Sequence, residues 1–265
     1  MPTVKITRQF KGKDCQRLRQ SFPLICDNKE RIADIITGDN RYEWTLTPYS
    51  GQAFVTNVTF IGQTGRGKST TINKIVGENL LSTDDIHSCT KVQENILFHL
   101  KDKAWFSVCD MPGIGESDAM QNQYNRWYIE MAEDSDVIVY VLNADQRDYR
   151  IDLDCFNTCL KGINRSKVII AINKIEKLFP RYYDNNDIIR SIQTPKAIRD
   201  ANHIKPHNIR NRYSVDLNKK IESVSRLFDI PQSRIIEYSA LEGMFISDLK
   251  DMITTMLFKN LAFGI

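Results

Sequence analysis

The sequence predicts an α/β fold with three layers, in which a six-stranded, mostly parallel sheet lies between helices. Two observations lead to this prediction. Short apolar segments rich in β-branched residues alternate with longer segments whose apolar residues recur every three or four positions, as strands and their crossover helices do. A glycine-rich turn also joins the first long strand to the helix after it, a pattern typical of folds that receive phosphate at a helix N-terminus.

Six segments have the length and composition of strands: residues 54–61, 92–100, 105–109, 136–142, 168–172 and 234–238. The turn at residues 101–103 is too short for a crossover helix, so the strands on either side of it are expected to pair antiparallel. This pairing supplies the one antiparallel strand of an otherwise parallel sheet.

Helical spacing of apolar residues predicts helices at residues 69–76, 121–132, 151–162, 214–228 and 244–257. Residues 177–211 mix aromatic residues, prolines and charges without a clear period, which predicts a loop-like stretch within a long connection at 177–233. We therefore expect an α/β domain at residues 54–265, preceded by a short extension at residues 1–53.

The extension is predicted to be mainly helical. Asp27 and Glu30 have the spacing of an N-cap and its capping-box acid, and Gly38 is placed as a C-cap. The apolar face of this helix would consist of Ile32, Ile35 and Ile36, and a further helix is expected over residues 14–20.

The glycine-rich turn is the strongest motif of the chain. It reads Gly62-Gln63-Thr64-Gly65-Arg66-Gly67-Lys68-Ser69, followed by Thr70, and matches G-x-x-x-x-G-K-[ST] in full. Glycines let backbone N–H groups converge on phosphate oxygens, Lys68 supplies a cation to the β- and γ-phosphates, and the Ser69 hydroxyl can ligate Mg²⁺. The turn therefore predicts a nucleoside triphosphate as ligand.

A second motif, D-x-x-G, ends the strand at 105–109. Its Asp110 can hold Mg²⁺ through water, and the N–H group of Gly113 can reach the γ-phosphate. Thr90, in the stretch 82–91 between the two motifs, is placed to close on Mg²⁺ and the γ-phosphate.

Two further motifs follow later strands: Asn173-Lys174-Ile175-Glu176 and Ser239-Ala240. In this order the five motifs resemble those of the Era-like and septin-like GTPases of the TRAFAC branch, especially bacterial YfjP/YeeP-type domains. The quoted segments are GQTGRGKST, SCT, DMPGIGES and NKIE, and the resemblance covers about residues 54–260.

The resemblance implies a P-loop G domain that hydrolyses GTP to GDP and phosphate with Mg²⁺ and acts as a switch stimulated by a partner or by dimerisation. It assigns catalysis to Lys68, Thr90, Gly113 and Arg150, and metal binding to Ser69, Thr90 and Asp110. It assigns nucleotide binding to residues 62–70 and to Asn173, Lys174, Glu176, Ser239 and Ala240.

Two departures from the family pattern keep alternatives open. Glu176 stands where the base-reading acid is normally Asp, so a P-loop NTPase with relaxed base specificity is one alternative. Ile114 stands where many GTPases place a water-orienting Gln. Hydrolysis without activation should therefore be slow, with Glu116, a backbone-held water or a partner's arginine in place of the Gln. A GTP-dependent assembly module with little or no hydrolysis is the other alternative.

Arg150 lies in Tyr149-Arg150-Ile151-Asp152, which is similar to a Tyr-Arg-x-Asp sequence of the chloroplast import receptor family. That similarity implies an arginine that crosses a homodimer at the nucleotide face to the partner's phosphates. The competing interpretation is that Arg147 and Arg150 only cap carboxylates such as Asp148 and Asp152. Arg66, inside the glycine-rich turn, is expected to face solvent.

The composition fits an intracellular switch. With a net charge of +3, 42% hydrophobic residues and no signal-peptide pattern or apolar run of about 18 residues, we expect a cytoplasmic protein without a transmembrane segment. The charge does not by itself support RNA, the ribosome or a membrane surface as partner, so a protein partner is expected but not identified. Cys155 and Cys159 share a helix face, for which core packing is favoured over metal binding.

Overall fold

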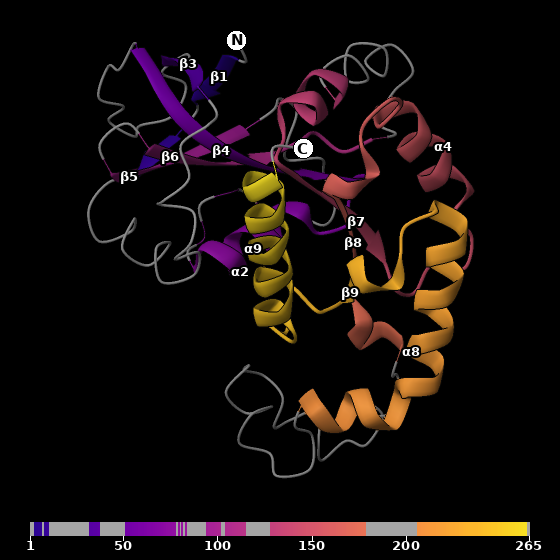
Figure 1. The fold of residues 1–265 in the computed structure, drawn as a ribbon. Helices are drawn as coiled ribbons and strands as arrows, with labels where there is room; N and C mark the ends of the chain where they lie inside the picture. The colour runs from indigo at the N-terminus through magenta and orange to yellow at the C-terminus, as the bar shows by residue number, and fades with distance from the viewer. Residues whose placement is uncertain are drawn as a thin grey trace.

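The structure is a computed structural model, and it describes residues 3–6, 8–10, 32–37, 51–77, 79, 81, 83, 94–101, 104–114, 128–178 and 206–263. These residues form one sheet of nine strands. Seven strands lie in the order β2-β5-β6-β4-β7-β8-β9, while β3 pairs with β4 and β1 pairs with β3 (Figure 1). The strands are β1 (Thr3–Ile6), β2 (Arg8–Phe10), β3 (Ile32–Thr37), β4 (Gly51–Ile61), β5 (Glu94–Lys101), β6 (Ala104–Asp110), β7 (Val137–Asn143), β8 (Val168–Asn173) and β9 (Ile235–Glu237).

The centre of the sheet is parallel. Strand β4 pairs in parallel with β6 and β7, and β7, β8 and β9 continue the parallel order. Strands β7 and β8 are buried along their whole length, as expected for parallel strands with helices on both faces. Their carboxyl ends therefore meet at one edge of the sheet, where open α/β sheets bind ligands.

All six expected strands are present, and the pair joined by the short turn, β5 and β6, is antiparallel. The count of six was too low, because β1, β2 and β3 extend the sheet. The expected helical face at Ile32, Ile35 and Ile36 is wrong, since this segment is strand β3, antiparallel to the first part of β4. An Ile-Ala-Asp-Ile-Ile-Thr segment fits either period, and its β-branched residues favour a strand once the long β4 offers an edge to pair with. The capping-box residues and the expected helix at 14–20 lie outside the described residues.

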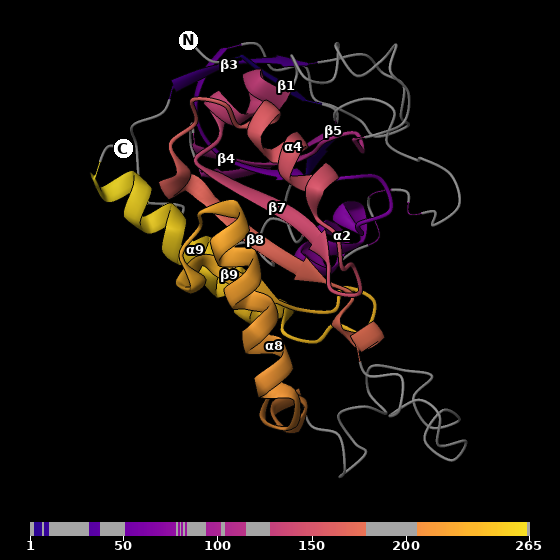
Figure 2. The same cartoon turned by 90° about the vertical axis from the view of Figure 1, so that its right-hand side faces the viewer.

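Helices cover both faces of the sheet (Figures 1 and 2). Helices α2 and α9 pack together on one face, and α4 and α8 pack together on the other. The helices are α2 (Lys68–Val76), α4 (Arg150–Cys159), α8 (Pro206–Phe228) and α9 (Ile246–Phe263), with short 3-10 turns at Arg165–Lys167, Ile175–Leu178 and Gln232–Arg234. Residues 128–134 are also helical, so the helix expected at 121–132 is present in its described part and runs two residues further. Helix α8 begins inside the stretch expected to be a loop, while residues 179–205 lie outside the described residues.

An aromatic cluster joins α4 and α8 to the sheet. The ring centroids of Phe156 and Phe228 lie 5.2 Å apart, and that of Tyr140 on β7 lies 5.1 Å from Phe156. All three side chains are buried. Cys155 and Cys159 are buried beside this cluster as free thiols, with a sulfur–sulfur distance of 3.8 Å, as core packing requires. Within the described ranges, no helix is long and apolar enough to cross a membrane.

Candidate functional site

The glycine-rich turn links the end of β4 to the start of α2. Gly62, Gly65 and Gly67 all have positive φ angles, of 149°, 73° and 86°. Two of these positions also have no room for a side chain. A Cβ atom at Gly62 would lie 2.5 Å from the carbonyl oxygen of Val141, and one at Gly67 would lie 2.5 Å from Nδ2 of Asn173. The turn is thus pressed against the ends of β7 and β8, and only glycine fits these two places.

Lys68 is folded back over this turn. Its buried ammonium group donates to the carbonyl oxygens of Gly62 at 3.0 Å and Gln63 at 3.2 Å. These bonds hold the positive charge in the concave side of the turn, next to the first N–H groups of α2. A cation and unsatisfied helix N–H groups in one place form a site that favours phosphate.

Ser69 and Asp110 are the two described residues that are predicted to hold a metal, and they lie next to each other. The Ser69 hydroxyl donates to Oδ2 of Asp110 at 2.5 Å, and Asp110 is buried at the end of β6. A hydroxyl and a carboxylate beside a phosphate site are the hard oxygen ligands that Mg²⁺ prefers, so this pair fits the ion. Thr90, the third predicted ligand, and Glu116 lie outside the described residues.

The D-x-x-G segment lies directly against the glycine-rich turn. A Cβ atom at Gly113 would come within 2.6 Å of Cα of Thr64. Thr64 N–H donates to the Ile114 carbonyl at 3.4 Å, and Ile114 N–H donates to the Gly62 carbonyl at 3.5 Å. The Ile114 side chain is buried in the core, so it cannot orient a water molecule.

Asn173 joins three loops at the sheet edge. Its Nδ2 donates to the carbonyl of Arg66 at 2.9 Å, and its Oδ1 accepts from the N–H of Ala240 at 2.9 Å. Lys174, in the left-handed region with φ 64°, donates from Nζ to the carbonyl of Gly65 at 2.6 Å. The predicted base-binding and phosphate-binding segments are therefore bonded to each other.

Glu176 is half-buried in the 3-10 turn that follows. Its Oε2 atom is buried and has no hydrogen-bond partner among the residues that the structure describes. Nearby, Ser239 accepts the N–H of Glu242 at 3.0 Å, and burial together with the charge of Glu176 raises the pKa of the Glu242 carboxyl, which Lys74 partly offsets. An acceptor left unpaired in a buried place fits a ligand that donates hydrogen bonds, as the edge of guanine does.

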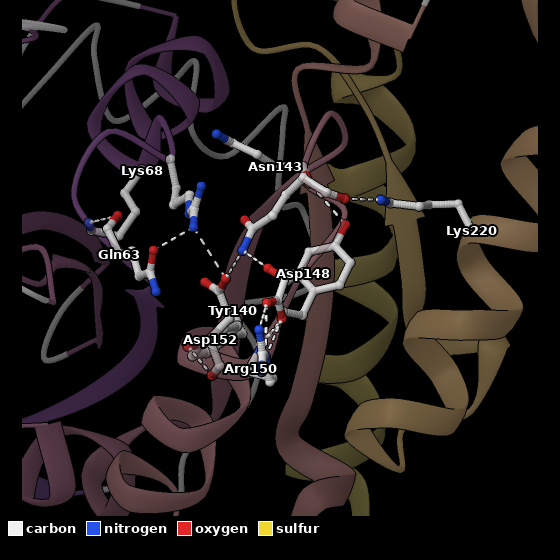
Figure 3. A network of polar contacts seen from close by, with 11 residues as sticks. Gln63, Lys68, Tyr140, Asn143, Asp148, Arg150, Asp152 and Lys220 are labelled. Carbon is white, nitrogen blue, oxygen red and sulfur yellow. Dashed lines mark hydrogen bonds and ion pairs between the residues drawn. The ribbon is translucent and has the colours of Figure 1, made fainter.

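Arg150 is exposed at the start of α4, with 86% of its side chain accessible. Its guanidinium pairs with Asp148, at 2.5 Å from Nη2 and 2.8 Å from Nε, which lowers the pKa of that carboxyl (Figure 3). Arg147 is also exposed. The competing interpretation is therefore right for Asp148, which pairs with Arg150, and wrong for Asp152, which pairs with neither Arg147 nor Arg150.

Arg66 does cap Asp152, so the expectation that Arg66 faces solvent is wrong. Only 14% of its side chain is exposed, and Nη2 lies 3.2 Å from Oδ2 of the fully buried Asp152. The same nitrogen donates to Oε1 of Gln63, and Gln146 donates to Oδ2 of Asp152 at 2.6 Å (Figure 3). The sequence does not by itself identify Asp152 and Gln146 as neighbours of the glycine-rich turn. One feature of the sequence could have indicated this contact: Asp152 is an acidic residue in the first turn of a helix that begins at the edge of the sheet where ligands bind.

Tyr238 and Thr71 were missed as well. The Tyr238 hydroxyl lies 2.8 Å from Oγ1 of Thr71, which also donates to the carbonyl of Gly67 at 2.7 Å. Burial raises the pKa of Tyr238 well above its ordinary value. This pair fixes the first turn of α2 to the end of β9.

The comparison with protein families matches residues 57–174 to the family described as 50S ribosome-binding GTPase. A probable GTP-binding protein EngB of Rhodopseudomonas palustris is 30% identical over 164 residues, which are 57% of this chain and 72% of that protein. The uncharacterized protein YkfA of Escherichia coli is 27% identical over 120 residues, or 45% of this chain. The match spans only 42% of the length of YkfA.

Among solved structures, Era in complex with MgGDPNP and a segment of 16S ribosomal RNA is similar in fold. Its TM-score is 0.53 at 20% identity, with 77% of this chain and 57% of that chain covered. A variant of Aquifex aeolicus Era bound to GDP and aluminium fluoride gives 0.50 at the same identity and coverage. The fold, the order of the motifs and the EngB relative agree, and the chain belongs to the Era-like P-loop GTPases of the TRAFAC class.

Proposed function

We propose that this chain binds GTP with Mg²⁺ and hydrolyses it to GDP and phosphate, as a switch whose turnover depends on a second copy or a partner. The observation that carries the proposal is the pair of bonds made by Asn173, which ties the phosphate-binding turn to the segment at Ala240. Such bonds make one continuous site for the base and the phosphates of a nucleotide.

The roles follow the predicted site. Residues 62–70 would surround the phosphates, Lys68 would neutralise the β- and γ-phosphates, and Gly113 would contact the γ-phosphate through its N–H group. Ser69 and Asp110 would hold Mg²⁺, together with Thr90. When bound, the ion supplies charge neutralisation on the β- and γ-phosphate oxygens.

Base recognition would come from Glu176 and Asn173, with Lys174 along the base plane and Ser239-Ala240 behind it. The unpaired Oε2 of Glu176 supports guanine, because guanine presents two adjacent donors, N1–H and the N2 amino group. Adenine presents no such pair of donors. A chain that binds adenine as tightly as guanine would therefore need a further hydrogen-bond donor of its own for the base.

Nucleotide titration by calorimetry tests this assignment. We expect GDP and GTP to bind in the presence of Mg²⁺, ADP and ATP to bind far more weakly, and Lys68→Ala to abolish measurable binding of all four. A wild-type chain that binds ATP as tightly as GTP would favour the alternative of an NTPase with relaxed base specificity. A Lys68→Ala variant that binds normally would remove the phosphate site itself.

A second candidate function is a GTP-dependent assembly module with little hydrolysis. The observation that favours it is the buried, apolar Ile114 at the position that often orients the attacking water. Single-turnover hydrolysis at several protein concentrations separates the candidates. A constant rate indicates a self-sufficient enzyme, a rate that rises with concentration indicates activation by assembly, and no hydrolysis indicates the module. A cytoplasmic location and a protein partner, either a second copy or another protein, stay predictions, and RNA, the ribosome or a membrane surface as partner is not supported by the charge of the chain.

A further inference from the structure

The side chain of Arg66 connects the phosphate-binding turn to helix α4. Arg66 lies between Gly65 and Gly67, two residues in left-handed conformation, so its own backbone is part of the curved turn. Its Nη2 atom donates both to Gln63 in the same turn and to Asp152 on α4. Its carbonyl accepts the bond from Asn173 at the same time. Arg66 is therefore held at its backbone by the base-binding segment and at its side chain by α4.

Asp152 is held as firmly from the other side. Its side chain is fully buried in the first turn of α4, and Gln146 donates to the same carboxylate oxygen that Arg66 contacts. Its carbonyl accepts the hydroxyl of Tyr140 at 2.8 Å. The carboxylate is thus fixed relative to strand β7, and any movement of the turn must stretch or break its contact with Arg66.

Stability alone does not explain this pair. Burial raises the pKa of the Asp152 carboxyl above its ordinary value, and Arg66 and Gln146 offset that cost only in part. Within the described part of the chain, Oδ1 of Asp152 and Nε of Arg66 are also buried without a hydrogen-bond partner. Buried ion pairs are often no more stable than apolar replacements of the same size, and orientation is what they supply in the best-attested cases.

We propose that Asp152 is a positioning residue for nucleotide binding: through Arg66 it fixes the curvature of the turn at residues 62–69. This inference rests on the proposed function, and it identifies Asp152 as a residue outside the turn that holds the turn in shape. The N–H groups of the turn converge on phosphate oxygens only in one curvature, so a turn released from α4 should bind the phosphates less well.

The same contacts continue to helix α8. Lys220 on α8 donates from Nζ to the carbonyl of Gln146 and lies 4.7 Å from the centre of the Tyr149 ring (Figure 3). Lys220, Gln146 and Asp152 therefore form a continuous row from α8 to Arg66.

The test is a double-mutant cycle on nucleotide affinity. The variants are Asp152→Asn, Arg66→Gln and both together, and the matched control is Asp154→Asn, which removes one carboxylate from the exposed side of the same helix. Affinities for GDP and GTP are measured by calorimetry, and the thermal midpoint of each nucleotide-free protein is measured in parallel.

We expect Asp152→Asn to weaken GDP and GTP by the same factor, about tenfold or more, because the turn surrounds phosphates that both nucleotides share. Once Arg66 is already Gln, the Asp152 change should cost much less. Asp154→Asn should bind as the wild type does, and the losses of affinity should not follow the order of the thermal midpoints.

Three outcomes would overturn the inference. They are unchanged affinity in Asp152→Asn, additive effects in the cycle, or a loss of affinity that follows a fall in the thermal midpoint. A wild-type chain that binds no guanine nucleotide would instead overturn the proposed function, and the inference with it.

Discussion

Glu176 presents a buried carboxylate oxygen that accepts no hydrogen bond from the described part of the chain. Asn173 is bonded to the protein at both ends of its amide but still keeps one N–H donor and one oxygen lone pair, whereas the acid at position 176 offers an acceptor oxygen that matches the donors of guanine. The identity of the nucleotide should therefore depend on this one side chain.

Replacing Glu176 by Asn should exchange guanine for xanthine. The amide donates where the carboxylate accepted, which matches the C2 carbonyl of xanthine, and guanine affinity should fall by about 100-fold or more. Competition of labelled GDP with unlabelled GDP and XDP measures the exchange. Glu176→Asp, which keeps both acceptor oxygens, is the control and should still prefer guanine. If Glu176→Asn also prefers GDP, the base is read elsewhere.

Asp152 makes the stability of the protein depend on pH in an unusual direction. Because its pKa in the folded state is raised, the folded state binds this proton more tightly than the unfolded state does. The contribution of this group to the free energy of unfolding is therefore fully present below the unfolded pKa and is lost as the pH rises through the folded pKa. Urea unfolding of wild type and Asp152→Asn across the acid range should show a difference that grows with pH in favour of Asn. A difference independent of pH would contradict the raised pKa.

Helix α4 is held to β7 and α8 through Phe156, whose ring contacts those of Tyr140 and Phe228. Phe156→Ala should lower the free energy of unfolding by about 3–5 kcal/mol, because it removes a buried ring and leaves a cavity. Asn157→Ala, on the exposed side of α4, should change it little. Urea denaturation with circular dichroism measures both, and equal small effects would mean that the cluster contributes no packing energy.

The central strands and the P-loop could be predicted because their signals are local. A β-branched run such as Ile169–Ile172 favours a strand by itself, and the glycine-rich turn is recognised from the spacing of its glycines, lysine and serine within eight residues. Strand β3 could not be predicted, because the spacing of its apolar residues fits both a helix and a strand. Only its pairing with strand β4 decides between the two. The pairing of Arg66 with Asp152 joins residues 86 positions apart, and no local pattern encodes such a contact. Contacts of that kind appear only when the sheet has placed its loops at one edge.

In the molecule as a whole, the exposed Arg150 offers a charged group for hydrolysis, and the buried Ile114 offers none. The chain lacks a water-orienting side chain at Ile114 and presents a guanidinium at the ligand edge of the sheet, where it pairs with the exposed carboxylate of Asp148. An arginine supplied by a second copy can speed hydrolysis by about 10³ or more.

Mixing two defective chains tests action between copies. Arg150→Ala binds GTP but should hydrolyse it slowly, whereas Lys68→Ala should bind no GTP but still carries Arg150. We expect the mixture to recover hydrolysis measured as phosphate release, and the wild-type rate to rise with protein concentration. An Arg150→Ala chain that is fully active by itself would contradict the role of this arginine.

The two bonds of Asn173 have a consequence for how a nucleotide is assembled into the site. The amide is already hydrogen-bonded to the phosphate-binding turn and to the segment at Ala240, so neither a guanosine fragment nor a pyrophosphate fragment has to arrange it. A nucleotide that carries both fragments on one ribose should therefore meet a site whose two halves are already held in register. A change at Asn173 itself, unlike one at Glu176 or Asp152, should alter the binding of the base and of the phosphates together.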